Sequence, residues 1–382
     1  MHKRIAIASL LLAVNSLVSA QMRTENSKSQ QIDAVFRPLV APGSPGLAVL
    51  VLKDGEVVFE HGYGIANLET RAAITPDTDF RLASFTKQFT ATCIMLLVHD
   101  GKLSYDDTLT KIFPGFPAYG RAITVRMLLT HTSGLKDYED LYAAQFPGVE
   151  DRKIPQIKDA QILALMEQQT STDFPPGSQW RYSNTGYAML AMIIEKASGK
   201  PFGDFLHEHI FAPLGMKNTL AYEKGKNEVP HRAIGYAKQD GAWVEADQSS
   251  TSAVLGDGGI YSDVEDLAKW DRALREHALL SAAEMQVAFI PVKVPGGAKT
   301  DDGEPTEYGF GWFLDPYKGR KRAWHSGTTT GFRTYIERFT DEGLTIIILC
   351  NRDDLQPKKL AERVANLYLS RSKRKRRNLH NR

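Results

Sequence analysis

The order of strand-like and helix-like segments is the feature of this sequence that most constrains its fold. Residues 46–64 hold two β-rich runs on either side of Asp54-Gly55, a dipeptide typical of a tight hairpin turn. From about residue 85 to 300, helical patterns alternate with loops rich in glycine and proline, and strand-like patterns return from about residue 308. This order predicts one sheet built from both ends of the chain, with a mostly helical lobe inserted between the ends.

The last quarter of the chain is expected to supply four strands and a closing helix. The strand-like segments read "YGFGWFLD", "RAWHSG", "FRTYIERF" and "LTIIILCN", and the helix covers residues 358–370. In the middle of the chain an apolar helix is predicted from about residue 185 to 197, because Gly199 and Pro201 end the pattern. No linker interrupts residues 32–370. We therefore assign them to a single domain of the mixed α/β (α+β) class.

The two ends of the chain differ from this domain. Residues 1–20 combine a basic start, an apolar run and the small residues "VSA" before Gln21, which predicts a secretory signal peptide and an exported protein, periplasmic or secreted. An uncleaved membrane anchor is the alternative. Residues 371–382 carry seven Lys or Arg and no acidic residue. This basic tail is interpreted either as a weak contact with an anionic surface or as a solvated end.

The composition is that of a soluble enzyme, with 42% hydrophobic and 24% charged residues. Nothing in it predicts a nucleic-acid groove. Two cysteines, Cys93 and Cys350, lie in apolar runs, so buried free thiols are expected, and one disulfide bridge is the alternative. No cluster has the ligand spacing of a metal site, and no glycine-rich phosphate loop is present, so neither a metal nor a cofactor is predicted.

Ser84 and Lys87 are the first candidates for chemistry. A serine hydroxyl is a weak nucleophile unless a base lies beside it, and residues three apart share one face of a helix. Burial among apolar residues would lower the pKa of a lysine enough for it to act as that base. The spacing alone is weak evidence, because Ser133 and Lys136 repeat it within a loop-like stretch. An ordinary serine beside a solvated lysine is therefore the alternative.

Two further segments hold polar residues suited to catalysis. "WRYSNTGY" contains Tyr182, whose hydroxyl could shuttle protons, and Asn184, whose amide could bind both a lysine and a substrate. "AWHSGTTTGF" contains His325 and Gly327, and a glycine in a strand permits close approach of a ligand. A surface turn and a structural histidine with a bulge glycine are the respective alternatives.

Taken together, these residues resemble the active-site signatures of one superfamily. Ser84-Phe85-Thr86-Lys87, Tyr182-Ser183-Asn184 and His325-Ser326-Gly327 match Ser-x-x-Lys, Tyr-x-Asn and His-x-Gly in that order. The set resembles the serine β-lactamase and penicillin-binding protein superfamily, and within it the branch related to class C β-lactamases, which includes DD-peptidases, D-amino-acid peptidases and esterases. The resemblance implies a β-lactamase-like fold, with an antiparallel sheet flanked by helices.

The resemblance also implies roles for the residues around the serine. Ser84 would be the acylated nucleophile and Lys87 its partner on the helix. Tyr182 would relay protons with Lys87, and Asn184 would orient the lysine and the substrate. The chemistry would need neither a metal nor a cofactor.

On the strand side, the resemblance implies three substrate-binding residues. His325 would line the cleft, Gly327 would allow close approach, and the backbone N–H of Thr328 would complete an oxyanion hole with that of Ser84. Class C β-lactamases usually have lysine where this chain has His325, which is mostly neutral near pH 7.

The histidine favours an exported amide or ester hydrolase acting on D-amino-acid peptides or carboxylic esters. A true β-lactamase and a non-catalytic penicillin- or peptidoglycan-binding sensor are the alternatives. The predicted partner is a small-molecule or peptide substrate, and the sequence does not indicate an oligomeric state.

Overall fold

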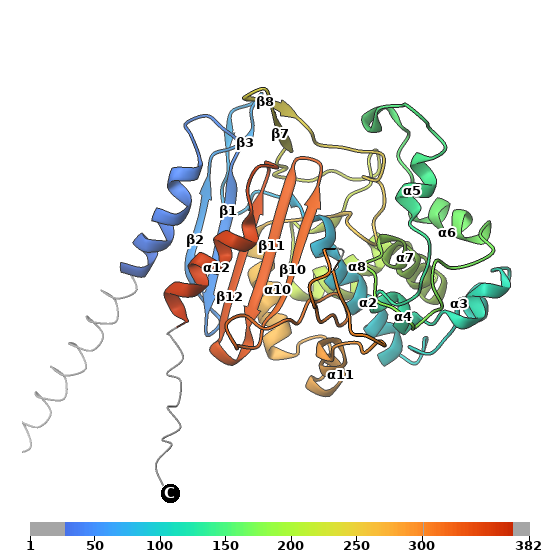
Figure 1. Cartoon of the computed structure of the whole chain (residues 1–382). Coiled ribbons are helices and arrows are strands. Elements are labelled where there is room, and N and C mark those ends of the chain that lie inside the picture. The colour runs from blue at the N-terminus through green and yellow to red at the C-terminus, as the bar shows by residue number, and fades with distance from the viewer. Residues whose placement is uncertain (1–26, 301, 370–382) are drawn as a thin grey trace, which may run out of the picture.

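The structure is a computed structural model that describes residues 27–300 and 302–369, so the predicted signal peptide and basic tail lie outside the described residues. Its centre is a five-stranded antiparallel sheet in the order β10-β11-β12-β1-β2 (Figure 1). The strands are β1 (Leu47–Lys53), β2 (Glu56–Tyr63), β10 (Ala323–Thr329), β11 (Phe332–Phe339) and β12 (Leu344–Cys350). Because β1 pairs with β12, with Leu47 opposite Cys350, the two ends of the chain build one sheet, as predicted.

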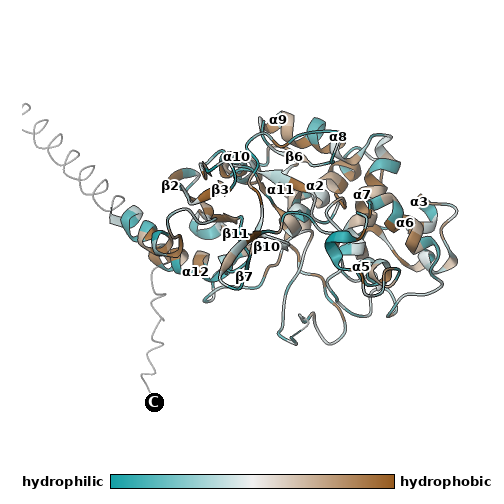
Figure 2. Cartoon of the chain, turned by 90° about the horizontal axis from the view of Figure 1, so that it is seen from above, coloured by the Kyte–Doolittle hydropathy of each residue, from teal (hydrophilic) through white to brown (hydrophobic). Residues whose placement is uncertain are grey.

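Both faces of this sheet are buried. Leu47, Val49 and Val51 of β1 belong to one core cluster, which also contains residues of α12 (Pro357–Tyr368) and of the helix at 27–36. The alternate residues Ala48, Leu50 and Leu52 belong to the core that the inserted helices share. Successive side chains of a strand point to opposite faces, so a strand that is apolar throughout becomes a central strand covered on both sides. Hydrophobic residues accordingly line the strands and inner helices (Figure 2).

The inserted lobe consists mainly of short helices. They are α2 (Lys87–His99), α3 (Leu109–Ile112), α4 (Val125–Leu129), α5 (Tyr138–Ala143), α6 (Asp159–Glu167), α7 (Asn184–Ser198), α8 (Phe202–Leu206), α9 (Ala212–Leu214), α10 (Val264–Glu276) and α11 (Ala282–Gln286). Many begin at a Ser, Thr or Asp whose side chain accepts a hydrogen bond from a backbone N–H of the first turn, as Ser183 does for α7 and Asp263 for α10. Loops and caps, rather than long helices, therefore set the shape of the lobe.

Three smaller sheets complete the fold. They pair β3 (Ile65–Asn67) with β4 (Ala72–Ala73), β9 (Ile260–Ser262) with both β5 (Phe80–Arg81) and β6 (Leu220–Ala221), and β7 (Tyr236–Gln239) with β8 (Ala242–Glu245). The pairing of β5 with β9 matters for the site, because β5 leads directly into the turn that contains Ser84.

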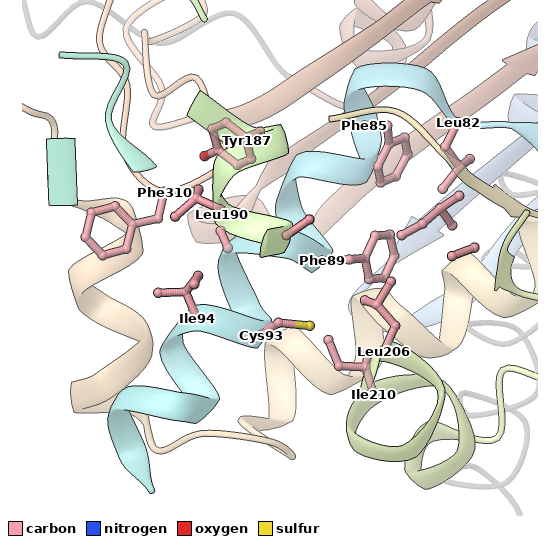
Figure 3. Packing of buried hydrophobic residues seen from close by; sticks show 14 of the residues in the cluster. Leu82, Phe85, Phe89, Cys93, Ile94, Tyr187, Leu190, Leu206, Ile210 and Phe310 are labelled. Carbon is pink, nitrogen blue, oxygen red and sulfur yellow. The ribbon is translucent and has the colours of Figure 1, made fainter. Parts of the chain in front are cut away.

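Helix α2 is the central helix of the lobe. It is buried on all sides over most of its length, which is typical of a helix in the core. The ring of Phe89 lies 4.5 Å from that of Trp270 and 5.7 Å from that of Phe211. On the opposite side, Ile94 faces Leu190 of α7 (Figure 3). This packing holds the first turn of α2, and with it Lys87, in a fixed position.

The segment "YGFGWFLD" differs from the prediction, because it forms a tight turn instead of a strand. Tyr308 and Phe313 pair with each other through an isolated bridge, and Gly311 has a φ of 76°. A Cβ atom at Gly311 would lie 2.8 Å from the carbonyl oxygen of Lys87. The alternating aromatic residues therefore cover the start of α2 rather than extend the sheet.

Other sequence expectations are met. Cys93 and Cys350 are both buried and free. The helix predicted at 185–197 is α7, and the closing helix is α12. Within the described part of the chain, we find no helix with the length and hydrophobicity needed to span a membrane.

Candidate active site

Ser84 lies in a 3-10 turn, Ala83–Thr86, directly before α2 rather than within an α-helix. Every residue from Thr78 to Met95 is buried except Ser84, which is partly exposed. Ala83 precedes it with a φ of 50°, a left-handed conformation that costs energy for a residue with a Cβ atom. Strain of this kind is commonly found at functional sites, and here it presents one hydroxyl from an otherwise buried segment.

Lys87 is fully buried and contacts three oxygen atoms. Its Nζ lies 3.1 Å from Ser84 Oγ, 2.9 Å from Asn184 Oδ1 and 2.9 Å from the carbonyl oxygen of Asp257. Residues three apart eclipse each other in a 3-10 turn, which brings the serine and the lysine together. Burial lowers the pKa of Lys87 to about 8, against the opposing charges of Asp257 and Glu139. Lys87 can therefore lose its proton near neutral pH and serve as a base.

The loop containing Asp257 is held from two sides. The Thr90 hydroxyl donates to the carbonyl of Gly256 at 2.7 Å, and the Asp159 carboxylate accepts the N–H groups of Leu255 and Gly256 at 2.8 and 3.1 Å. These contacts aim the Asp257 carbonyl at Lys87. Burial raises the pKa of the Asp257 carboxyl group, which accepts a hydrogen bond from Tyr138.

Tyr182 packs close to Lys87, whose Nζ lies 5.0 Å from the centre of the phenol ring. Its hydroxyl oxygen is buried and makes no hydrogen bond of good geometry with the described residues. Burial raises the pKa of Tyr182 well above 10, and the Ser84 hydroxyl opposes this rise only in part. Tyr182 is thus a neutral phenol near pH 7, and Lys87 is the group able to accept a proton.

His131 fixes the segment around Tyr182. The N–H of Arg181 donates to the His131 carbonyl at 3.0 Å, and the N–H of Ser183 donates to His131 Nδ1 at 3.1 Å. The imidazole also packs against the Tyr182 ring, with ring centres 4.4 Å apart. His131 itself has a φ of 59°. His131 therefore binds the backbone of both chain neighbours of Tyr182 and packs against the Tyr182 ring.

Replacing His131 with alanine should lower kcat by roughly 10- to 100-fold, because small displacements of a catalytic group have effects of this size. KM should change little. His131→Asn should recover much of the loss, because asparagine tolerates positive φ and its Oδ1 can accept the N–H of Ser183. Steady-state kinetics of both variants, with thermal unfolding as a control, test this. Equal losses of kcat in the two variants would contradict a positioning role.

Asn184, the first residue of α7, links Lys87 to a carboxylate. Its Oδ1 accepts from Lys87, and its Nδ2 donates to Glu139 Oε1 at 2.8 Å. Burial, and the nearby carboxylate of Asp257, raise the pKa of Glu139. The amide therefore has a fixed orientation, as the predicted role of Asn184 requires.

The strand β10 positions the remaining predicted residues differently. A Cβ atom at Gly327 would lie 2.0 Å from the carbonyl oxygen of Leu82, which also accepts a hydrogen bond from Thr334 at 2.7 Å. The close approach at Gly327 is thus made by the turn before Ser84 and not by a ligand. It sets the distance between β10 and the serine.

His325 is 1% exposed and lies behind the pocket wall rather than on it. Its Nδ1 is 2.7 Å from the carbonyl oxygen of Ser326, so Nδ1 carries the proton, and Nε2 accepts from Tyr308 Oη at 3.2 Å. Burial and the charge of Lys87 lower the pKa of His325 to about 3. The expectation that His325 lines the cleft is therefore corrected: its neutral ring packs inside, near Tyr182 and Phe313.

A pocket of about 50 Å³ opens above Ser84. Its walls come from both halves of the fold and comprise Arg81, Ala83, Ser84, Tyr138, Glu139, Asn184, Thr251, Asp257, Gly258, Thr328 and Thr329. Thr328, predicted to supply an oxyanion N–H, thus faces the same space as the serine. Asn184 lines the same pocket, whereas Lys87 lies behind the pocket wall in contact with Ser84 and Asn184, and Tyr182 packs beside Lys87. A partly exposed serine backed by a buried amine is the arrangement needed for attack on a carbonyl carbon.

The sequence analysis missed His131, Glu139 and Asp257 as individual site residues. Glycines that mark turns were the available signal for two of them. His131 lies in the stretch "LLTHTSGL", and Asp257 lies in "GDGGIYSDVEDLAKW". Asn351 on the last strand is fully buried and bridges backbone groups of Gly46, Ile65 and Ile234.

Comparison with known proteins gives one consistent result. The sequence model of the Beta-lactamase family matches residues 32–369. Penicillin-binding protein 4* of Bacillus subtilis is 34% identical over 86% of this chain and 73% of its own length. A D-aminopeptidase of Brucella anthropi is 32% identical over 80% of this chain, which spans 56% of that relative. The structure of D-amino acid amidase from Ochrobactrum anthropi SV3 superimposes with a TM-score of 0.72, at 27% identity, over 89% of this chain and 98% of the amidase.

Proposed function

Because this chain belongs to the β-lactamase family of serine hydrolases, we propose that it hydrolyses amides of D-amino acids through an acyl-Ser84 intermediate. The observation that supports this most directly is the contact between the partly exposed Ser84 hydroxyl and the buried Lys87 amine at 3.1 Å. The names of two similar proteins, a D-aminopeptidase and a D-amino acid amidase, support the choice of substrate. Carboxylic esters, whose carbonyl reacts in the same way, are proposed as further substrates.

In the proposed reaction, neutral Lys87 accepts the proton of Ser84 Oγ as this oxygen bonds to the substrate carbonyl carbon. The resulting oxyanion is held by the backbone N–H groups of Ser84 and Thr328. The proton then passes to the amide nitrogen, either from Lys87 directly or through the Tyr182 hydroxyl, and the C–N bond breaks. Water attacks the acyl-serine by the reverse sequence, which releases the acid and restores Ser84.

The pocket lining holds two acids, Glu139 and Asp257, and one cation, Arg81, a balance that favours a substrate with a free amino group. The Glu139 carboxylate lines the pocket beside Ser84, and its partner Asn184 leaves its second oxygen available. His325, where many class C β-lactamases have a lysine, is neutral and buried. We therefore propose that the substrate ammonium group lies against Glu139.

Replacing Glu139 with glutamine should raise KM for an amide with a free α-ammonium group by roughly tenfold, because a charge-assisted hydrogen bond is lost. The glutamine Oε1 can still accept from Asn184, so kcat should fall less. The N-acetylated form of the same substrate serves as the matched control and should be hydrolysed equally by parent and variant. An equal rise in KM for both substrates would show that Glu139 acts only through Asn184.

A substrate panel tests the proposed function. The purified protein is assayed with D-phenylalanine amide, L-phenylalanine amide, a p-nitrophenyl ester and benzylpenicillin. The proposal expects turnover of the D-amide well above that of the L-amide. Turnover of benzylpenicillin alone would identify a β-lactamase, and acylation without turnover would identify a penicillin-binding sensor. Either result would overturn the proposal.

We also propose that residues 1–20 direct export to the periplasm or the medium, on the basis of their basic start, apolar run and small residues before Gln21. Amino-terminal sequencing of the protein made in a bacterial host tests this, and a mature chain that still begins at Met1 would contradict it.

A further inference from the structure

A second and larger cavity, of about 560 Å³, lies at the opposite end of the main sheet from Ser84. Strand β10 contributes to both sites: Ala323 lines this cavity, and Thr328 lines the pocket of Ser84. Five residues of extended strand separate the two, which corresponds to roughly 16 Å. The cavity falls within the size range of sites that take small organic ligands. The proposed hydrolysis makes no use of it.

The walls of this cavity are largely apolar. Leu274 comes from the end of α10, Phe339 from the end of β11 and Leu344 from the start of β12. Phe289 comes from the turn after α11, and Leu314 from the segment before β10. Phe339 and Leu344 are at most 1% exposed and belong to the core cluster on the α12 face of the sheet, so the apolar surface open to a ligand comes from Leu274, Phe289 and Leu314. Such a surface would take up the hydrocarbon or aromatic part of a ligand.

The charged residues of the lining are mostly cations. Four of them, Arg275, Lys321, Arg322 and Arg338, face only two acids, Asp271 and Glu307. Arg338 pairs with Asp271, and Glu307 is exposed, so the cations that can meet a ligand are those with a weak partner or an open side.

Arg338, like Arg322, is a buried cation of this set. Its side chain is 7% exposed, and its Nε donates to Asp271 Oδ1 at 2.7 Å, while its Nη2 lies 3.4 Å from the Asp271 carbonyl oxygen. The Nη1 atom of Arg338 makes no hydrogen bond to a described residue and is not fully enclosed. The guanidinium is thus fixed on one side and available on the other.

Two exposed cations stand near the mouth of the cavity. Arg275 pairs with Glu276 at 3.2 Å and Lys321 with Asp341 at 3.6 Å, with 42% and 80% of their side chains exposed. Exposed ion pairs of this kind contribute little and exchange readily for another anion. Arg322 is different, because Asp315 and Glu362 already hold its guanidinium.

We propose that this cavity binds a small amphipathic carboxylate, with its apolar body against Leu274, Phe289 and Leu314 and its carboxylate directed to Arg338 and the two exposed cations. An apolar wall beside fixed cations disfavours an ammonium ligand and gives no advantage to a sugar. The site is independent of the proposed hydrolysis, since it shares no lining residue with the pocket of Ser84.

Titration calorimetry with three ligands of equal chain length tests the proposal. Octanoate should bind saturably at one site per chain, and octanol and octylammonium should each bind at least tenfold more weakly. Equal affinity for octanoate and octanol would overturn the proposal, as would the absence of saturable octanoate binding.

Variants of lining residues test whether octanoate binds in this cavity. The double variant Arg275→Glu, Lys321→Glu should weaken octanoate binding by at least threefold, and the matched double variant Lys102→Glu, Lys217→Glu, which reverses two lysines outside the cavity, should not. Leu314→Trp should fill the cavity and abolish binding while hydrolysis continues. If Leu314→Trp does not fold, the charge-reversal pair decides alone. Unchanged affinity in Arg275→Glu, Lys321→Glu would overturn the location, whatever the outcome of the hydrolysis assays.

Discussion

Replacing Lys87 with methionine is expected to lower kcat by roughly three to four orders of magnitude, the upper range for loss of a general base. Methionine has a similar length and is apolar, so it should fit the buried position better than the cation it replaces. The parent enzyme should show kcat/KM rising with pH through about 8, the pKa of Lys87. Below this value the lysine is protonated and cannot accept the serine proton, so the rate should fall tenfold per pH unit.

The variant should lose this pH dependence together with its activity. Lys136→Met is the matched control, because Lys136 also follows a serine by three residues but binds Gln169 at 3.0 Å, outside the pocket. Its kcat should stay within about threefold of the parent value. A Lys87→Met variant that keeps the inflection near pH 8 would show that another group is the base.

Replacing Ser84 with alanine is expected to lower kcat by roughly four to six orders of magnitude, as is found when a catalytic serine is removed. The oxyanion N–H groups and the pocket remain, so substrate should still bind with a similar dissociation constant. Ser133→Ala is the matched control: Ser133 is 1% exposed, and its hydroxyl caps the N–H of Leu135. Loss of turnover in Ser133→Ala with retention in Ser84→Ala would reverse the assignment.

The central sheet could be predicted because local sequence and tertiary position agree there. β1 is apolar up to its last residue, Lys53, as a strand covered on both faces must be, and Asp54-Gly55 forms the turn to β2. The segment at Tyr308 misled the prediction, because alternation of aromatic residues and glycines resembles a strand. Its partner is the start of α2 rather than another strand, and no local pattern reports that contact.

In the candidate site, too, some features could be predicted from sequence, whereas others depend on contacts made only in the folded chain. Ser84 and Lys87 could be paired from sequence because they are three positions apart, although the turn proved to be 3-10 rather than α-helical. Asp257 could not be assigned, because it contributes a backbone carbonyl, which every residue has. His131 acts on Tyr182, 51 positions further along the chain, through contacts that only the folded chain creates.

His325 illustrates how burial changes a prediction based on residue type. The sequence places a titratable ring on an edge strand, where contact with substrate is expected. In the fold, Tyr308, Tyr182 and Phe313 cover that ring. The buried imidazole therefore stays neutral and packs beside Tyr182 instead of contacting substrate. The residue that we propose for contact with a charged substrate is instead Glu139, which accepts a hydrogen bond from Asn184.

Intact-mass analysis after reaction with a β-lactam or a phosphonate probe tests the central claim most directly. We expect one covalent adduct per chain, which peptide mapping places on Ser84 and which is absent from Ser84→Ala. An adduct that persists in Ser84→Ala, or that maps to Ser133, would contradict the assignment of the nucleophile and with it the proposed acyl-serine mechanism.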